Sequence, residues 1–341
     1  MNAGITVPTF TPNKLSAIEL RSPPDDFLPN EPEGAAFHKA FQAAGIAGFD
    51  CRYLAIFRGD QRVAVVPYFL DELNLNTMLH EGLLKRCLSR ARLRIACVGH
   101  PSTDFGMIDG EKSADVLALV NATLEKQAPL VAYKGFTSGL PLPDFVRVSG
   151  LPVTVLMLEG DYYSGLDSRR RNDFHHKLEA AKALRIEECC ELPEHLLARV
   201  FQLYLNTFNR APLRFERLTL DYFRQTAGLG KFLLFYEADM LIGFVQLICK
   251  GNKASFKYVG MDYRHNRQYG LYYVMCLKGI EACLRDGYQH LELGVTSYHF
   301  KHLLGGQLVP TDIYYRHNNP LVNWLFGKLK FLLEPSADEL R

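Results

Sequence analysis

The stretch of residues 231–316 constrains the fold most, because its pattern predicts a fixed order of strands and helices. Two apolar segments, residues 231–236 and 241–249, flank a short turn at residues 237–239 and predict a buried hairpin. A third strand is expected over residues 255–261 after a second turn. Three strands joined by short turns therefore open this region.

A long helix is expected next, over residues 268–286. Its polar residues Lys278, Glu281 and Arg285 are spaced at three and four, so they form one narrow polar stripe on an otherwise apolar cylinder. Such a helix is covered on most sides. Residues 290–295 then alternate with period two, which predicts a strand.

The order of hairpin, third strand, helix, parallel strand and short helix resembles the GNAT superfamily of N-acyltransferases. Residues 291–294 are followed by Lys301, by two glycines at residues 305–306 and by a strand over residues 311–315. This tail resembles the BioF2-like branch, which is related to the Fem-type (FemAB-related) aminoacyl transferases. The resemblance implies an α/β fold with two tandem GNAT-like domains, each a mixed sheet flanked by helices.

The first half of the chain repeats the pattern at an offset of 179 residues, as from Leu54 to Leu233. The matched residues are Leu54, Ile56, Asp60, Val63 and Val66 with Leu233, Phe235, Asp239, Ile242 and Val245. Residues 96–99 likewise match residues 257–260, and each segment is followed by a polar loop and a helix. Two copies of one supersecondary unit are therefore expected.

Five segments are expected along the chain. They are a loosely ordered N-terminal arm (1–34), a first GNAT-like domain (35–160), a helical connector leading into the second domain (161–230), a second GNAT-like domain with the donor site (231–319), and a C-terminal amphipathic helix with a tail (320–341). The apolar run at residues 320–334 is too short to span a bilayer. We expect it to dock on the core, and the alternative is an interfacial helix on a membrane.

Charge and cysteine content narrow the class of protein. A net charge of +2 gives no global attraction to nucleic acid or membrane, so any polyanion site must be local. No stretch reaches the roughly 18 apolar residues that cross a bilayer, and the first thirty residues lack the pattern of a signal peptide. The eight cysteines have no C-x-x-C spacing and predict reduced thiols. We expect a cytoplasmic protein, placed at the inner face of the membrane if residues 320–334 touch lipid.

The amino end of the long helix is the expected site for donor phosphates. The resemblance implies that the third and fifth strands splay apart, that a carrier lies between them, and that its phosphates sit on this helix end. Arg264, Arg267, Gln268 and Gly270 lie there, and two of them match the family's Arg/Gln-x-x-Gly-x-Gly/Ala loop. Tyr272 stands where the last small residue belongs, and Fem-type relatives, which take aminoacyl-tRNA, also lack the clean loop. The alternative is a basic turn exposed to solvent.

Four residues are candidates for the chemistry itself. N-acyl transfer needs a base for the amine, donors for the developing negative charge and an acid for the leaving group. The resemblance implies that Lys301 faces the reacting centre, and Tyr298 on the same short helix is a candidate acid. Glu292 and Asp262 are candidate bases, with solvent-facing strand positions as the alternative. No metal site is expected, because the two nearby histidines have no third ligand near them in sequence.

Two basic clusters suit a polyanionic carrier. The first comprises Lys85, Arg86, Arg90, Arg92 and Arg94, and the second spans residues 169–177. Such clusters fit tRNA, an acyl carrier protein or an anionic membrane, although basic helices are often only solvated faces. The second cluster resembles the Ser-x-x-Arg-Arg segment that opens the second domain in the related branches, which implies that Arg171 binds the carrier.

The combined prediction is an acyltransferase without a tightly bound cofactor. It moves an acyl group from acyl-CoA or an acyl carrier protein to an amine of a sugar, an amino acid or a cell-envelope precursor. Aminoacyl-tRNA-dependent transfer of the Fem type is the first alternative, which the basic clusters and the imperfect loop support. A non-catalytic binding protein that kept the fold is the second.

Overall fold

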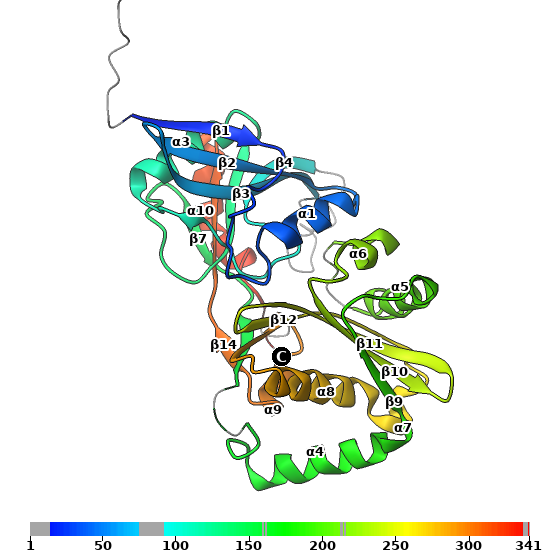
Figure 1. Cartoon of the computed structure of the whole chain (residues 1–341). Coiled ribbons are helices and arrows are strands. Elements are labelled where there is room, and N and C mark those ends of the chain that lie inside the picture. The colour runs from blue at the N-terminus through cyan, green and yellow to red at the C-terminus, as the bar shows by residue number, and fades with distance from the viewer. Residues whose placement is uncertain are drawn as a thin grey trace, which may run out of the picture.

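Two mixed sheets flanked by helices make up the protein, which is described by a computed structural model (Figure 1). The structure describes residues 14–74, 92–158, 160, 162–211, 214, 216–336 and 340. The α/β class and the tandem arrangement predicted from the sequence are confirmed.

The first sheet contains strands from both ends of the chain. Its order is β1 (Leu15–Leu20), β2 (Asp50–Arg58), β3 (Gln61–Asn74), β4 (Arg92–Val98), β6 (Leu130–Phe136), β15 (Asp312–His317) and β7 (Val146–Ser149), and β5 (Asp109–Gly110) pairs with β3. Helices α1 (Ala35–Ala43) and α3 (Ala114–Leu124) cover it. In α3, the buried residues Val116, Leu117, Val120 and Leu124 share one helical face, which packs into the core of this sheet.

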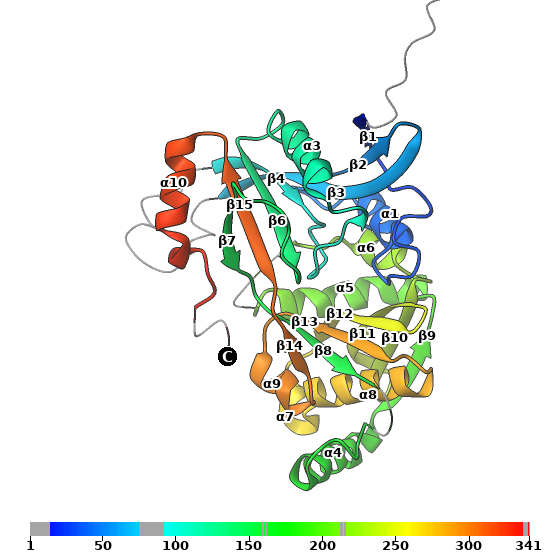
Figure 2. The same ribbon diagram turned by 90° about the vertical axis from the view of Figure 1, so that its left-hand side faces the viewer.

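The second sheet has the order β14 (Gln307–Val309), β8 (Val153–Met157), β13 (His290–Gly294), β12 (Lys253–Met261), β11 (Met240–Lys250), β10 (Gly230–Glu237) and β9 (Arg185–Cys189). Its helices are α4 (Ser168–Ala180), α5 (Glu194–Phe208), α6 (Leu220–Gln225), α7 (Asn266–Tyr269), α8 (Leu271–Arg285) and α9 (Tyr298–Leu303). In Figures 1 and 2, α8 lies on one face of this sheet, and α5 and α6 lie on the face toward the first sheet. The edge strand β9 was not predicted, because its sequence is polar and short.

The predicted duplication is visible in the topology. Strands β2, β3 and β4 are antiparallel and lead through α3 into β6, which is parallel to β4. Strands β10, β11 and β12 are antiparallel and lead through α8 into β13, which is parallel to β12. The two halves therefore share one plan.

The expected domain boundaries need correction, because the halves exchange strands. Strand β8 follows β7 directly but joins the second sheet, between β13 and β14. Strand β15 follows β14 directly but joins the first sheet, between β6 and β7. The two crossing segments meet where the Gly150 amide donates to the Thr311 carbonyl at 2.8 Å. Neither 35–160 nor 231–319 is thus a separate structural unit.

The N-terminal segment also differs from the expected loose arm. Leu15–Leu20 pairs with β2 over six residues, and Phe27 is completely buried against Tyr53. Residues 1–13 lie outside the described part. The strand was missed because six alternating residues between polar and proline-rich flanks give only a weak periodic signal.

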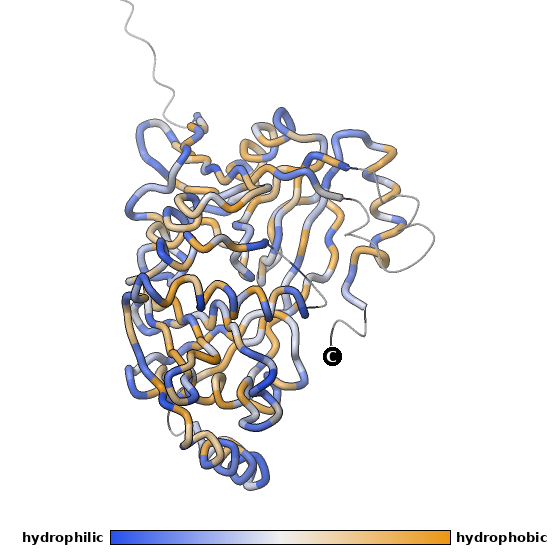
Figure 3. Tube along the Cα trace, turned by 90° about the vertical axis from the view of Figure 1, so that its right-hand side faces the viewer, coloured by the Kyte–Doolittle hydropathy of each residue, from blue (hydrophilic) through white to orange (hydrophobic). Residues whose placement is uncertain are grey.

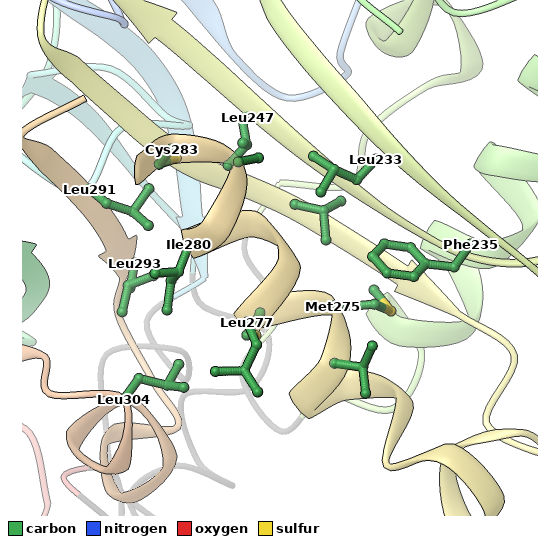
Figure 4. Close-up of a cluster of buried hydrophobic side chains, with 14 of the residues drawn as sticks. Leu233, Phe235, Leu247, Met275, Leu277, Ile280, Cys283, Leu291, Leu293 and Leu304 are labelled. Atoms are coloured by element: carbon green, nitrogen blue, oxygen red, sulfur yellow. The ribbon is translucent and has the colours of Figure 1, made fainter. Parts of the chain in front are cut away.

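Three large hydrophobic clusters hold the fold together. The first surrounds α8, where Leu277, Ile280 and Cys283 face Leu291 and Leu293 of β13 (Figure 4). A second joins α1, α5 and α6 with strands of both sheets, and a third fills the space under α3. Apolar segments gather in the interior, while the outlying helix α4 is largely hydrophilic (Figure 3). The shared second cluster fixes one half against the other.

The C-terminal helix α10 (Pro320–Lys328) does not dock as a core helix, contrary to expectation. None of its residues is buried, and the short helix η3 (Lys330–Leu332) that follows has none either. A nine-residue helix at the surface can cover only one of its faces, so the apolar side chains on its other face stay exposed. Within the described ranges, no helix is long and apolar enough to cross a membrane.

Candidate active site

A cavity of about 720 Å³ lies between the two sheets. Its walls come from β12, from β13 with the loop into α9, from the loop after β4 and from α5. The crossing segments add Gly150, Leu151 and Thr311. Both halves of the chain therefore form the cavity.

The cavity opens where β12 and β13 part. These strands pair at only three positions, the last joining Ser255 to Glu292, although β12 runs on to Met261. In the first half, β4 pairs with β6 up to Val98, its last residue. The register of β12 against β11 also shifts, so that Lys257 is an extra residue in the ladder. Past Ser255, the β12 backbone facing β13 has no strand partner and can donate to a ligand.

Lys301 lies in this cavity, as predicted. Its side chain is 6% exposed, and its ammonium donates to the carbonyls of Gly294 at 2.9 Å and Val295 at 2.6 Å. Burial lowers the pKa of Lys301 to about 8, although Asp104 and Glu292 act in the opposite direction. An ammonium has three donors, so one remains for a substrate atom.

Glu292 also lines the cavity, at the last paired position of β13. Burial raises the pKa of Glu292 well above its ordinary value, and the nearby carboxylates of Glu33 and Asp104 raise it further. A carboxylate with a raised pKa is a stronger base.

The structure adds cavity residues that sequence reasoning missed. The Lys257 ammonium pairs with Glu33 and donates to the Ser102 carbonyl. Burial lowers the pKa of Lys257, but Glu33 and Asp104 more than offset this, so its pKa is raised and the ammonium is held charged. Lys134 donates to the Pro101 carbonyl at 3.1 Å and lines the same wall.

Asp104 approaches the backbone at Gly294. A Cβ at Gly294 would lie 2.8 Å from the Asp104 carboxylate and 4.0 Å from the Lys301 ammonium. The backbone φ of Gly294 is +74°. Only glycine fits here without strain. The carboxylate thus reaches the floor of the cavity beside Lys301.

A hydroxyl chain extends from the opposite wall. Tyr258 donates to Glu216, and its hydroxyl lies 2.8 Å from the Ser102 hydroxyl. Burial raises the pKa of Tyr258 well above its ordinary value, so the phenol keeps its proton. Tyr204 and Phe208 of α5 make this wall largely aromatic.

Asp262 does not enter the cavity, and its environment argues against the predicted role as base. Its carboxylate accepts from Arg264, with Oδ2 at 2.5 Å from Nη2. This hydrogen bond is the largest cause that lowers the pKa of Asp262 to about 2, so the carboxylate is a weak proton acceptor. Arg264 is in turn engaged by Asp262 and does not line the cavity.

Tyr298 and Arg171 lie outside the cavity as well. The Tyr298 hydroxyl donates to the Pro152 carbonyl at 2.9 Å and ties α9 to the strand crossing. Arg171 is exposed and donates to the carbonyls of Tyr163 and Leu166 ahead of α4. Both side chains bond to backbone carbonyls, so they hold the segments before α4 and at the strand crossing in place.

The amino end of α8 differs from an open phosphate loop. Gly270 has a φ of +58° and separates α7 from α8. The Asn266 side chain accepts from the Tyr272 amide at 3.0 Å, which occupies one of the free donors of the helix end. The Tyr272 ring packs on Phe300 with centroids 4.8 Å apart and lines the cavity. Gln268 is exposed, and the Arg267 side chain lies outside the described part.

The basic clusters are partly neutralised. Arg92 pairs with Glu72 at 3.4 Å, while Lys85, Arg86 and Arg90 lie outside the described residues. In α4, Arg170 and Lys177 pair with the acids Asp167 and Asp173. Where side chains are described, no three His, Cys, Asp or Glu residues are grouped so that they could hold a metal ion.

The sequence carried a signal for two of the missed residues. Lys257 stands in the segment whose counterpart in the first copy is residues 96–99, and Asp104 follows in the polar loop after that counterpart. Polar residues at equivalent strand ends of two copies meet if the copies pack together. Glu33 has no such signal, because its segment has no counterpart in the second copy and lies among polar and proline-rich residues.

Comparisons with known proteins agree with this geometry. Residues 168–302 match the family described as acetyltransferase (GNAT) domain. The structure is similar to that of FemX, with a TM-score of 0.54 and 11% identity over 85% of this chain and 93% of that one. It also resembles L-PGS from Bacillus licheniformis (TM-score 0.53) and a tandem GNAT protein from the clavulanic acid biosynthesis pathway (TM-score 0.52), each at 11% identity over 90% of this chain and 99% of the other. No curated protein matches in sequence.

Proposed function

We propose that this protein, which has the tandem GNAT fold and matches the acetyltransferase (GNAT) domain over residues 168–302, transfers an acyl group from a thioester carrier to an amine. The carrier is acyl-CoA or an acyl carrier protein, and the acceptor is an amine of a sugar, an amino acid or a cell-envelope precursor. The observation that carries the proposal is the parting of β12 and β13 over a cavity that contains Lys301 and Glu292.

The thioester lies between the parted strands in this proposal, with its carbonyl oxygen toward the unpaired backbone of β12 past Ser255. Backbone N–H groups at this point stabilise the negative charge that develops on the oxygen. The acceptor enters from the side of the first sheet, where the Asp104 carboxylate attracts its ammonium.

Glu292 removes a proton from the acceptor ammonium, and the free amine attacks the carbonyl carbon. A carbon–nitrogen bond forms, and the carbon–sulfur bond breaks as the intermediate collapses. Lys301, whose pKa of about 8 is close to that of a thiol, gives a proton to the departing thiolate. As the intermediate collapses, the attacking nitrogen loses its second proton to the Lys301 amine, so that Lys301 ends charged again. Charge and protons then balance, because the acceptor ammonium loses two protons, of which one ends on Glu292 and the other, through Lys301, on the thiol.

Direct assay of donor classes tests this proposal. Purified protein is incubated with acyl-CoA or acyl carrier protein and a panel of amines, and the released thiol and acylated amine are quantified by mass spectrometry. We expect turnover with at least one thioester, and turnover lower by about 10²-fold or more with the Lys301→Met variant. Binding of a thioester without turnover of any amine would instead favour the non-catalytic alternative.

Aminoacyl-tRNA-dependent transfer remains a second candidate, because one observation favours it. Asn266 occupies the Tyr272 amide at the helix end where a coenzyme A pyrophosphate would bind. A filter-binding series with aminoacyl-tRNA separates the two, since tRNA binding falls steeply with salt and coenzyme A binding does so much less. Lack of tRNA retention at low salt would remove this candidate.

A further inference from the structure

Helix α10 has two different faces. Its inner face, with Val322, Phe326 and Leu329 partly buried, contacts β15 and β7. Its outer face carries Leu321, Trp324 and Leu325, which are 71%, 59% and 45% exposed. The spacing of three and four puts these side chains on one side of the helix. Helix α10 lies at the edge of the molecule (Figure 2), and its exposed side is therefore apolar.

Between residues 320 and 333, the charged side chains beside this surface are all cations. Lys328 lies one turn after Trp324, and its ammonium is 5.8 Å from the centroid of the indole ring. Lys330 and Phe331 follow in η3, and Phe331 is 62% exposed. Residues 320–333 contain no Asp or Glu. We call Leu321, Trp324, Leu325, Lys328, Lys330 and Phe331 the outer patch.

We propose that the outer patch binds an anionic lipid surface, independently of the proposed acyl transfer. A helix of nine residues is about 14 Å long, so it lies in the plane of the surface and does not cross it. The leucines and Phe331 enter the boundary between headgroups and acyl chains, and Trp324 sits at headgroup level. The lysines contact the anionic headgroups. A second copy of this patch would instead bring lysines against lysines.

Trp324 is the single tryptophan of the chain, so its fluorescence reports on this patch alone. The full-length protein is titrated with phosphatidylcholine vesicles and with vesicles containing about one quarter phosphatidylglycerol. We expect a blue shift of the emission and loss of iodide quenching with the anionic vesicles only. High salt reverses the binding, because it screens the lysines.

Matched variants separate the apolar and the electrostatic contributions to vesicle binding. Leu321→Glu keeps the tryptophan and lowers partition into anionic vesicles by about tenfold or more. Ile18→Glu, at a residue of β1 that is 52% exposed, leaves partition unchanged. The double change Lys328→Glu and Lys330→Glu lowers partition by on the order of tenfold. Circular dichroism verifies that each variant is folded.

Three results would overturn the proposal. One is unchanged Trp324 emission at millimolar anionic lipid. Another is equal binding to neutral vesicles, which would leave the lysines without the assigned role. The third is a blue shift that grows with protein concentration in the absence of lipid, because it would identify a second copy as the partner.

Discussion

Lys301→Met tests the proposed chemistry most directly. The substitution keeps an unbranched side chain of similar length and removes the ammonium that donates to Gly294 and Val295. We expect turnover to fall by about 10²-fold or more, as for loss of one preorganised donor at a reacting centre. The KM for the donor changes little, since the walls of the cavity remain.

The effect on stability can be worked out from the pKa. A shift from 10.5 to about 8 means that burying the charged form costs about 3 kcal/mol at pH 7. Methionine avoids that cost but removes a donor from the partly buried carbonyls of Gly294 and Val295, at up to about 1–3 kcal/mol each. The contributions oppose each other, so we expect the free energy of unfolding at pH 7 to change by less than about 3 kcal/mol.

The pH dependence has a definite sign. Between pH 8 and the ordinary pKa of lysine, the unfolded chain holds a proton on Lys301 that the folded protein has lost. The stability of the wild type therefore rises with pH in this range, by up to about 3 kcal/mol relative to Lys301→Met. Denaturant unfolding from pH 7 to 10 measures this difference.

Kinetics complete the test. The wild-type rate should fall above about pH 8 as Lys301 loses its proton, and the residual activity of Lys301→Met should lack that limb. Lys278→Met, which removes a surface ammonium paired with Glu281, serves as control and keeps full activity. Full turnover in Lys301→Met with the true substrate pair would refute the assignment.

Other substitutions test the remaining assignments. Glu292→Gln should lower turnover by about 10²–10⁴-fold, and an unchanged rate would exclude the base role. The variant should also have a higher free energy of unfolding in urea at pH 7–8, because the raised pKa of Glu292 means that the wild type loses stability as pH rises. Asp262→Asn should keep its turnover but lower the free energy of unfolding by about 1–2 kcal/mol at pH 7, and this difference should fade as pH falls toward 2. Reduced turnover at unchanged stability would contradict this prediction. Gly294→Ala should lower the free energy of unfolding by more than about 1 kcal/mol and remove most activity, because the φ of Gly294 is positive and Asp104 is close. Gly139→Ala is the control, since a Cβ there meets open space, and equal stability of the two variants would disprove the strain.

Local patterns were sufficient for the elements and for part of the site. Hairpins, the apolar helix α8 and the two copies follow from periodicity over ten to twenty residues. The family resemblance pointed to Lys301, and the strand pattern to Glu292, and both residues line the cavity. The sequence did not place Asp262 outside the cavity, because its hydrogen bond with Arg264, two residues later, depends on a geometry that spacing does not specify.

The rest depends on contacts between residues far apart in the chain. Lys257 pairs with Glu33, which is more than two hundred residues away in sequence. Periodicity predicts that a polar residue lies on a strand, but it does not predict which residue pairs with that side chain. The same limit applies to β8 and β15, since their alternation fits either sheet equally well.

The strand exchange has a consequence for synthesis of the chain on the ribosome. Strand β6 ends at Phe136, but its neighbour β15 begins only at Asp312. At about 5–20 residues per second, the edge of β6 stays unpaired for roughly 10–35 s after it emerges. Its buried residues Leu130, Val131 and Tyr133 form an apolar strand edge of the kind that aggregates when exposed. Strand β8 must likewise wait for β13, so neither sheet can close until almost the whole chain has left the ribosome.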